Sequence, residues 1–570
     1  MRETAQKRAR LVVFGVLLLS LTLLVRLYYV QILYGSFFTD KADRQYVSRN
    51  GTLFDRGTIY FTDKDQNLVS AATLKTGFTL ALNTKLLENA SSTYTKILAL
   101  YPLEEESFFA KALKPNDPYE ELVNKIPEEV GTKISELKIP GVIVERERWR
   151  YYPGNGLSAQ TLGFVGFKND VLTGQYGVER YYNDILSRDS SKAYANFFAQ
   201  IFSDLKKTVA DRDYKGEGDL VLTIEPSVQQ FLEQELHDVK DEYSAEAAGG
   251  IVMNPKTGEI YAMAANPSFN PNTYNEEKNP AVFGNPLVEN VYEMGSIIKP
   301  LTMAAGLDAG AVTPETTYDD KGTIELNGKK ISNYDGKARG VVPMQEVLSQ
   351  SLNVGVAFVE QKLGNDRFTE YFKKYGLGEE TGIDLPGEVA GLIKNLDSPR
   401  DVEHATAAFG QGIALTPIET VRALASLGNG GTLVTPHVVK QVRYKVGVTK
   451  DVSYDDGTQV ISKETSSAIT RMLVTVVDKA LQKGKIKLDH YSVAAKTGTA
   501  QIPNPVTGKY YEDRYLHSFF GYFPAYDPQF IVFFYMYYPK HVQYASETLT
   551  TPFANTSKFL INYYNVAPDR

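Results

Sequence analysis

The chain has 570 residues, too many for one ordinary hydrophobic core, so we expect two or more domains. Hydrophobic residues make up 43% of it and charged residues 23%, close to the globular average, which argues against long disorder. A net charge of −7 argues against a nucleic-acid-binding protein, and the absence of cysteine excludes a disulfide framework and a cysteine nucleophile. The six histidines form no HExxH pair, so we expect no metal site, and we expect no cofactor.

The N-terminus carries basic residues followed by an apolar run. Basic side chains at positions 2, 7, 8 and 10 precede a charge-free stretch at residues 11–25. Extended through Val30, with Arg26 reaching toward the interface, this stretch attains the roughly 20 residues that cross a bilayer. The alternatives are a cleaved signal peptide, for which no A-x-A-like site follows, and a buried core helix. We predict a single-pass anchor at residues 11–30 in the inner or plasma membrane, with residues 1–10 cytoplasmic and the remainder periplasmic or extracellular.

A mixed, charge-rich region at residues 40–218 follows the predicted anchor. Its short strand-like runs include Asp55-Arg56-Gly57 and Arg150-Tyr151-Tyr152-Pro153, and none of them pairs a nucleophile with a base. We therefore expect a structural domain here. The polar segment at residues 211–219 is typical of a domain boundary, so a second domain is predicted at residues 219–566.

The second domain has long apolar and β-branched runs. We predict a strand at residues 220–224, a helix at residues 226–238, and a hairpin whose strands at 250–254 and 260–265 flank a turn. Near the C-terminus we predict strands at residues 492–502, 517–523 and 530–538 and a helix at 551–564. Strand pairs that bracket a central helical region indicate an antiparallel sheet covered by helices.

Three short strings in this domain carry the candidate chemistry. They are Ser296-Ile297-Ile298-Lys299, Ser351-Leu352-Asn353 and Lys496-Thr497-Gly498-Thr499. Alone, the first is typical of an exposed helix pair, the second of a turn and the third of a strand edge. In this order, with the first opening an apolar helix and the last inside a β-run, they match a serine–lysine acyl-transfer signature.

The first string supplies a nucleophile and a base. On a helix, Ser296 and Lys299 share one face, so the amine can reach the hydroxyl. A free Lys titrates near 10.4, and a neutral amine at pH 7 therefore costs about 4.6 kcal/mol. Burial and a second cation both lower that cost, and Lys496 supplies the cation if its strand lies beside the helix. Whether Lys299 is itself the acylation base stays open at this point.

The other two strings supply relay and binding groups. Ser351 and Asn353 suit proton relay and binding of a substrate amide. Gly498 would let a substrate strand approach the sheet edge, and the hydroxyls of Thr497 and Thr499 would bind a terminal carboxylate. Lys496 would attract the anionic end of the substrate. The backbone N–H groups of Ser296 and Thr499 would form an oxyanion hole.

These strings resemble the penicillin-binding transpeptidases of bacterial cell-wall synthesis. The segment before Ser296 resembles the family's own, although Met294 stands where a Pro is usual. Further resemblances lie at Phe409-Gly410-Gln411-Gly412, Leu415-Thr416-Pro417, Asn429-Gly430-Gly431 and Ser518–Pro524. The two strings quoted from residues 40–218 resemble the non-catalytic pedestal, or dimerisation-type, domain of class B members.

The resemblance implies a fold and a branch of the family. The expected fold class is α/β. Residues 219–566 would form a penicillin-binding transpeptidase fold, with an antiparallel sheet flanked by helices and a helical subdomain. Residues 40–218 would form an elongated α+β pedestal, preceded by one transmembrane helix. The paired-Glu motifs of the class A glycosyltransferase are absent, which favours class B. Residues 333–337 resemble the septal, division-type branch more than the elongation branch.

The resemblance also implies an activity. We expect a serine-type peptidoglycan D,D-transpeptidase that acts through an acyl-enzyme at Ser296, is inhibited by β-lactams and serves cell-wall synthesis in cell division. Its partners would be D-Ala-D-Ala stem peptides, an acceptor amine, a membrane glycosyltransferase and other division proteins. The alternatives are an elongation-type transpeptidase, a β-lactamase, a penicillin-sensing receptor and a non-catalytic division scaffold. The large pedestal and the anchor argue against the β-lactamase, the short cytoplasmic tail against the receptor and the three intact strings against the scaffold.

Overall fold

The computed structural model describes residues 54–114, 117–169, 171–188, 216–445, 447–455 and 457–570. The chain divides into two compact units. Within the described residues the first unit is essentially Leu74–Trp149, and the second contains Arg56–Thr73, Arg150–Arg188 and the chain from residue 216 onward. The predicted cytoplasmic tail and anchor lie outside the described residues. Within those residues, every helix is too short or too polar to cross a bilayer.

The first unit is a small α+β body with its own core. Strand β2 (Leu68–Leu82) enters it and pairs antiparallel with β3 (Glu120–Pro127), and β4 (Val142–Tyr151) pairs with β2. Its helices are α3 (Ala90–Leu98), α4 (Glu105–Ala112) and α5 (Glu128–Glu136). The core consists of buried side chains from both element types, including Leu80, Ile97, Phe108, Ile126 and Ile134.

A buried charge cluster joins two segments of the second unit, residues 56–73 and 150–188, which the sequence assigns to the pedestal. The Glu179 carboxylate receives Nε of Arg56 and Nε of Arg150, each at 2.6 Å, and all three side chains are almost fully buried. Burial opposes ionisation, but the two guanidinium groups hold the pKa of Glu179 below its usual value. Arg150 also donates to the Gly57 carbonyl at 2.7 Å. The two sequence strings around Arg56 and Arg150 are thus structural, as expected.

Short elements surround this cluster. They are β1 (Ile59–Thr62), α6 (Ala159–Leu162), β5 (Val165–Lys168), β6 (Val171–Gly174), α7 (Gly177–Tyr181) and α8 (Asn183–Leu186). Strand β1 pairs in parallel with β7 (Gly218–Leu222), which pairs antiparallel with β15 (Val439–Tyr444), and β15 continues to β16 (Thr449–Asp451).

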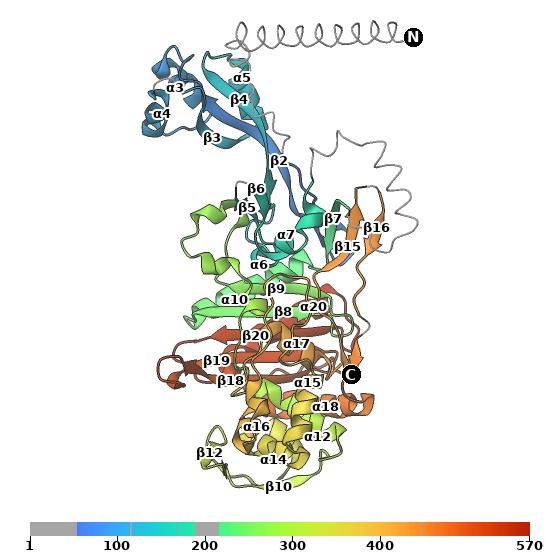
Figure 1. Cartoon of the computed structure of the whole chain (residues 1–570). Helices are drawn as coiled ribbons and strands as arrows, with labels where there is room; N and C mark the ends of the chain where they lie inside the picture. The colour runs from blue at the N-terminus through green and yellow to red at the C-terminus, as the bar shows by residue number, and fades with distance from the viewer. Residues whose placement is uncertain (1–53, 115–116, 170, 189–215, 446, 456) are drawn as a thin grey trace, which may run out of the picture. The chain divides into compact units, whose positions relative to one another are not determined.

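A five-stranded antiparallel sheet is the centre of the second unit (Figure 1). Its order is β18-β19-β20-β8-β9, with β8 (Ala247–Met253), β9 (Ile260–Asn266), β18 (Ala494–Asn504), β19 (Lys509–Phe523) and β20 (Phe530–Tyr537). Side chains of β20 alternate between two cores: Val532 and Phe534 pack toward α10 (Pro226–Glu242) and α20 (Thr550–Tyr563), and Phe533 packs on the opposite side. Burial of both faces explains the continuous apolar run of this strand.

The opposite face of the sheet contacts the 3₁₀ turn η4 (Gly295–Ile298) and helix α18 (Lys463–Thr475) through β18. A helical region with several small hairpins continues from there. Its helices are α11 (Pro286–Glu289), α12 (Lys299–Asp308), α13 (Met344–Ser349), α14 (Asn353–Leu363), α15 (Asn365–Lys374), α16 (Asp401–Ala407) and α17 (Pro417–Ala425). The hairpins pair β10 (Thr317–Asp320) with β13 (Gly340–Pro343), β11 (Thr323–Leu326) with β12 (Lys329–Ser332), and β14 (Thr432–Leu433) with β17 (Thr458–Gln459).

Single-turn elements complete the unit. They are η2 (Pro271–Glu276), η3 (Pro280–Phe283), η5 (Lys394–Asp397), η6 (Val476–Ala480), η7 (Leu481–Gly484) and α19 (Ala545–Thr548).

The secondary structure predicted for this unit is confirmed, with shifts at element ends. The helices predicted at residues 226–238 and 551–564 are α10 and α20, and the predicted hairpin is β8–β9. The predicted strand at 220–224 is β7, which ends at Leu222. Strand β19 begins eight residues before the prediction because its first half is a polar, exposed hairpin arm that carries no apolar signal.

Candidate active site

The three sequence strings converge on one pocket from three different elements. Ser296 lies in η4, Ser351 in the turn before α14, and Lys496–Thr499 in β18, which is the edge strand of the main sheet. The pocket has a volume of about 630 Å³. Six of the predicted site residues line it: Ser296, Ser351, Asn353, Lys496, Thr497 and Thr499.

Backbone packing places Ser296 against β18. Gly295 adopts φ +63°, and a Cβ there would lie 2.8 Å from the Thr499 carbonyl oxygen. Its N–H donates to the Gly410 carbonyl at 3.1 Å, and the Ser518 hydroxyl donates to the Met294 carbonyl at 2.7 Å. The segment before the nucleophile is therefore held between the sheet and the loop at Gly410.

Gly498 has a close neighbour that the sequence did not indicate. A Cβ at this position would lie 2.3 Å from the Ser518 hydroxyl oxygen and 2.6 Å from the Met294 carbonyl oxygen. The protein's own nucleophile segment thus approaches Gly498 closely. Gly498 allows Ser296 to sit close to the edge strand.

Lys299 is fully buried and reaches Ser351. Its Nζ donates to the Ser351 carbonyl oxygen at 2.5 Å and to the Ser351 hydroxyl oxygen at 3.1 Å. Ser351 accepts both bonds from a left-handed backbone, φ +55°, which is uncommon for a residue with a side chain. Within the described part of the chain, the hydrogen bonds of this amine go to Ser351 and not to Ser296.

The two lysines of the site have lowered pKa values. Burial first, and then the charge of Lys496, hold the pKa of Lys299 well below its usual value. Burial lowers the pKa of Lys496 to about 7, and its Nζ donates to the Thr497 carbonyl at 2.9 Å. Burial and the neighbouring charge therefore both favour the neutral amine of Lys299.

The remaining predicted residues also have defined partners. Asn353 is the first residue of α14, and its side-chain N–H donates to the Ser332 carbonyl at 2.9 Å. This bond fixes the orientation of the Asn353 carboxamide. The Thr499 hydroxyl accepts the Ala545 N–H at 3.1 Å, so it also anchors the start of α19. In that bond the Thr499 hydroxyl oxygen is the acceptor, so its O–H remains available to donate to a carboxylate.

Sequence reasoning missed several residues that line the pocket. Tyr334 and Tyr544 come from loops far apart in the chain, and their rings meet edge-to-face with centroids 6.0 Å apart. Tyr334 had a signal, because an aromatic residue inside the polar loop 333–337 is unusual, whereas nothing distinguishes Tyr544 in its loop. The other missed residues include Gln350, Gln501, Tyr515 and Gln543.

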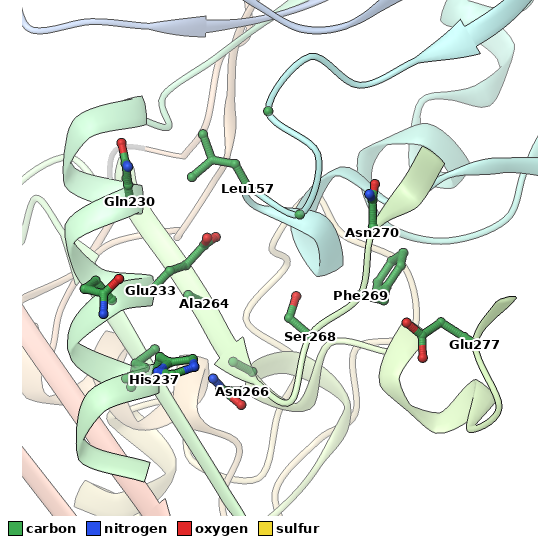
Figure 2. A pocket seen from close by; sticks show the side chains of 15 residues that line it. Leu157, Gln230, Glu233, His237, Ala264, Asn266, Ser268, Phe269, Asn270 and Glu277 are labelled. Carbon is green, nitrogen blue, oxygen red and sulfur yellow. The ribbon is translucent and has the colours of Figure 1, made fainter. Parts of the chain in front are cut away.

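A second pocket, of about 750 Å³, lies between α10 and the end of β9 and lacks a reactive pair (Figure 2). Its Ser268 hydroxyl donates to Gln160 at 3.3 Å, and its Glu233 carboxylate accepts the Ser158 N–H at 2.7 Å. These two polar groups are thus hydrogen-bonded to neighbouring parts of the fold. In the part of the chain that is described, no group of three or more His, Cys, Asp or Glu side chains gathers as metal ligands would.

Comparison with known proteins gives one consistent picture. Residues 248–557 match the model of the penicillin binding protein transpeptidase domain, and residues 54–197 match the penicillin-binding protein dimerisation domain. Stage V sporulation protein D of Bacillus subtilis is 33% identical over 560 residues, covering 96% of this chain and 84% of the relative. Peptidoglycan D,D-transpeptidase FtsI of Buchnera aphidicola is 26% identical over 471 residues, covering 81% and 78%. The apo structure of penicillin binding protein 3 from Mycobacterium tuberculosis superposes with a TM-score of 0.65 at 26% identity, covering 74% of this chain and 92% of that one.

Proposed function

We propose a residue-level mechanism for this chain, which belongs to the class B penicillin-binding protein transpeptidases. It is a serine-type peptidoglycan D,D-transpeptidase of cell-wall synthesis. The observation that carries the mechanism is the buried amine of Lys299, which donates to Ser351 beside Lys496 in the pocket that Ser296 lines.

Ser296 is the nucleophile in this mechanism. A neutral Lys299 uses two N–H groups on the carbonyl and hydroxyl of Ser351, and its lone pair remains for the Ser296 proton. The Ser296 oxygen then attacks the penultimate D-Ala carbonyl of a stem peptide. The negative charge that develops on the carbonyl oxygen is stabilised by the N–H groups of Ser296 and Thr499.

The leaving D-Ala takes a proton from the Lys299 ammonium, directly or through the Ser351 hydroxyl. The acyl group stays on Ser296 until the amine of a second stem peptide attacks it. Lys299 accepts the proton of that amine and passes it to the departing Ser296 oxygen, which regenerates the Ser296 hydroxyl and the neutral Lys299. Proton donors and acceptors balance over the two steps, so no cofactor takes part in the cycle.

Substrate binding uses the rest of the pocket. Lys496 and the hydroxyls of Thr497 and Thr499 bind the terminal carboxylate of the donor, and Asn353 binds a backbone amide of the stem peptide. β-Lactams enter the same pocket and acylate Ser296. The transpeptidase domain spans residues 219–566 and the pedestal domain residues 40–218.

The cellular setting is the second part of the proposal. The chain serves cell division, which agrees with the names of the sporulation and FtsI-type relatives. Residues 11–30 anchor it in the inner membrane with residues 1–10 in the cytoplasm, and a membrane glycosyltransferase supplies the glycan strands on which it acts.

Labelling with a fluorescent penicillin tests the mechanism. Wild-type protein is expected to form a long-lived covalent adduct and to release D-Ala from a D-Ala-D-Ala stem-peptide substrate. Ser296→Ala is expected to do neither while melting at the wild-type temperature. An adduct on Ser296→Ala would refute the assignment of the nucleophile, and rapid hydrolysis of the wild-type adduct would indicate a β-lactamase.

A further inference from the structure

Glu293 lies three residues before the nucleophile, and the mechanism above gives it no role. Its Oε1 accepts the Gly412 N–H at 3.0 Å. The Tyr510 hydroxyl lies 3.0 Å from each of its two oxygens and donates to the carboxylate. One half-buried carboxylate thus connects three segments that are more than 95 residues apart in the sequence.

All three segments adjoin residues that line the catalytic pocket. Glu293 belongs to the nucleophile segment, Gly412 follows the pocket-lining residues Phe409 and Gln411, and Tyr510 lies on the arm of the β18–β19 hairpin opposite Pro503. The nucleophile segment and the Gly410 loop are already joined by backbone bonds, because Tyr292 and Leu415 exchange N–H···O bonds of 2.9 and 2.8 Å. The side chain of Glu293 adds the hairpin arm to this pair.

The hairpin arm needs such a tether. Most residues between Pro503 and Arg514 are exposed, so little core packing fixes the arm. The same two strands carry Gln501 and Tyr515 into the pocket and Lys496 and Thr497 at its floor. A shift of the arm relative to η4 therefore changes the width of the pocket where the substrate binds.

The strength of the hydrogen bonds that Glu293 accepts from Tyr510 and Gly412 depends on whether its carboxyl group is ionised. Burial raises the pKa of Glu293 to about 7, and the hydrogen bonds from Tyr510 and Gly412 oppose that rise. Among the described residues, Tyr510 is the one titratable side chain that bonds it, and no charged side chain contributes to its shift. Hydrogen bonds to an ionised carboxylate are roughly twice as strong as neutral ones, so the tether is strongest above pH 7.

We propose that Glu293 is a positioning residue that holds the β18–β19 hairpin arm and the Phe409–Gly412 loop against the nucleophile segment, and thereby sets the geometry of acylation. The proposal deepens the function proposed above and rests on it. The contact through Tyr510 is stronger with the ionised carboxylate than with the neutral carboxyl group.

The test compares acylation by penicillin in wild type, Glu293→Gln and Tyr510→Phe between pH 6 and pH 9. The readouts are the second-order acylation rate constant and the fraction of molecules that form an adduct. At pH 8.5 both variants are expected to acylate about fivefold more slowly, from the difference between charged and neutral hydrogen bonds. The ratio of wild type to Glu293→Gln is expected to fall to about one at pH 6, because both side chains are then neutral. Any titration of Lys299 affects both proteins and cancels in this ratio.

The melting temperature of Glu293→Gln is not expected to fall together with its acylation rate. This difference separates a positioning role of Glu293 from a structural one. The folded pKa of Glu293, about 7, lies above the ordinary value of 4.5, so the stability that this group contributes falls as the pH rises between these two values and stays at the lower level above pH 7. Glu293→Gln should therefore melt no lower than wild type at pH 8.5 and leave the adduct-forming fraction unchanged. Glu512→Gln and Tyr526→Phe, at exposed positions on the same hairpin and the next turn, are the matched controls and should behave as wild type.

Two outcomes overturn the inference. One is a rate ratio of about one at every pH. The other is a slower rate that follows a smaller adduct-forming fraction or a lower melting temperature. In either case normal labelling of wild type and none of Ser296→Ala would leave the mechanism standing, so failure of this inference is distinguishable from failure of the proposed function.

Discussion

The charge of Lys496 is expected to help keep Lys299 neutral, and replacing it with an uncharged side chain tests this directly. Burial is the first cause of the low Lys299 pKa and the Lys496 charge the second. Two unit charges about 4 Å apart interact by about 4 kcal/mol at an effective dielectric of about 20, which gives the scale of such an effect. Because burial remains in the variant, we expect Lys496→Gln to raise the pKa of Lys299 by about one unit, or about 1.4 kcal/mol.

The assay is the rate of acylation at saturating penicillin, measured against pH. Saturation separates the effect on the base from any loss of carboxylate binding, which appears in the concentration needed for half saturation. The acylation rate falls at low pH as Lys299 becomes protonated, which gives the plot of rate against pH an acidic limb. This limb is expected to shift to higher pH by about one unit in Lys496→Gln. Lys496→Arg keeps the charge and should leave the limb in place. A limb that does not move in Lys496→Gln would refute the reasoning.

Three further results are expected. Ser351→Ala removes the hydroxyl that receives Lys299 but keeps the carbonyl, and it should slow acylation by about 100-fold, within the usual range for proton-transfer groups, with little change in melting; a rate within twofold of wild type would exclude Ser351 from the relay. Gly498→Ala places a methyl group 2.3 Å from the Ser518 hydroxyl oxygen and 2.6 Å from the Met294 carbonyl oxygen. The substitution should therefore displace the nucleophile segment and reduce the rate of adduct formation by at least tenfold, and normal labelling would contradict this placement. Lys496→Met should raise the melting temperature at pH 7 more than at pH 10. The reason is that the folded pKa of Lys496 is about 7, so the wild type loses stability as the pH falls from about 10.4 toward 7. Equal shifts of the melting temperature at both pH values would contradict the lowered pKa.

The elements that position the site could be predicted because their signals are local. The apolar run of β20 and the turn between β8 and β9 are visible in a few consecutive residues. The spacing of Ser296 and Lys299 likewise places both on one turn without any knowledge of the fold. These features depend on backbone geometry and on burial, and both of these leave a periodic pattern in the sequence.

Contacts between distant segments had no such signal. The bond from Lys299 to Ser351 joins residues 52 positions apart and depends on the left-handed backbone of Ser351, which nothing in its neighbours indicates. A glycine in a strand, such as Gly498, indicates a close approach but does not identify the approaching group, so the nearby Met294 carbonyl had no signal in the sequence. Glu293 and Tyr510 are 217 residues apart, and neither is unusual in its own segment.

The central claim is that Ser296 is the acylated residue in a pocket where Lys299 is its base. The most direct measurement is mass spectrometry of peptides from wild-type protein labelled with penicillin, together with Lys299→Gln as a second sample. The account predicts that the whole mass increase lies on Ser296 in wild type and that Lys299→Gln shows almost none under the same conditions. A modification on any other residue, or full labelling of Lys299→Gln, would contradict it.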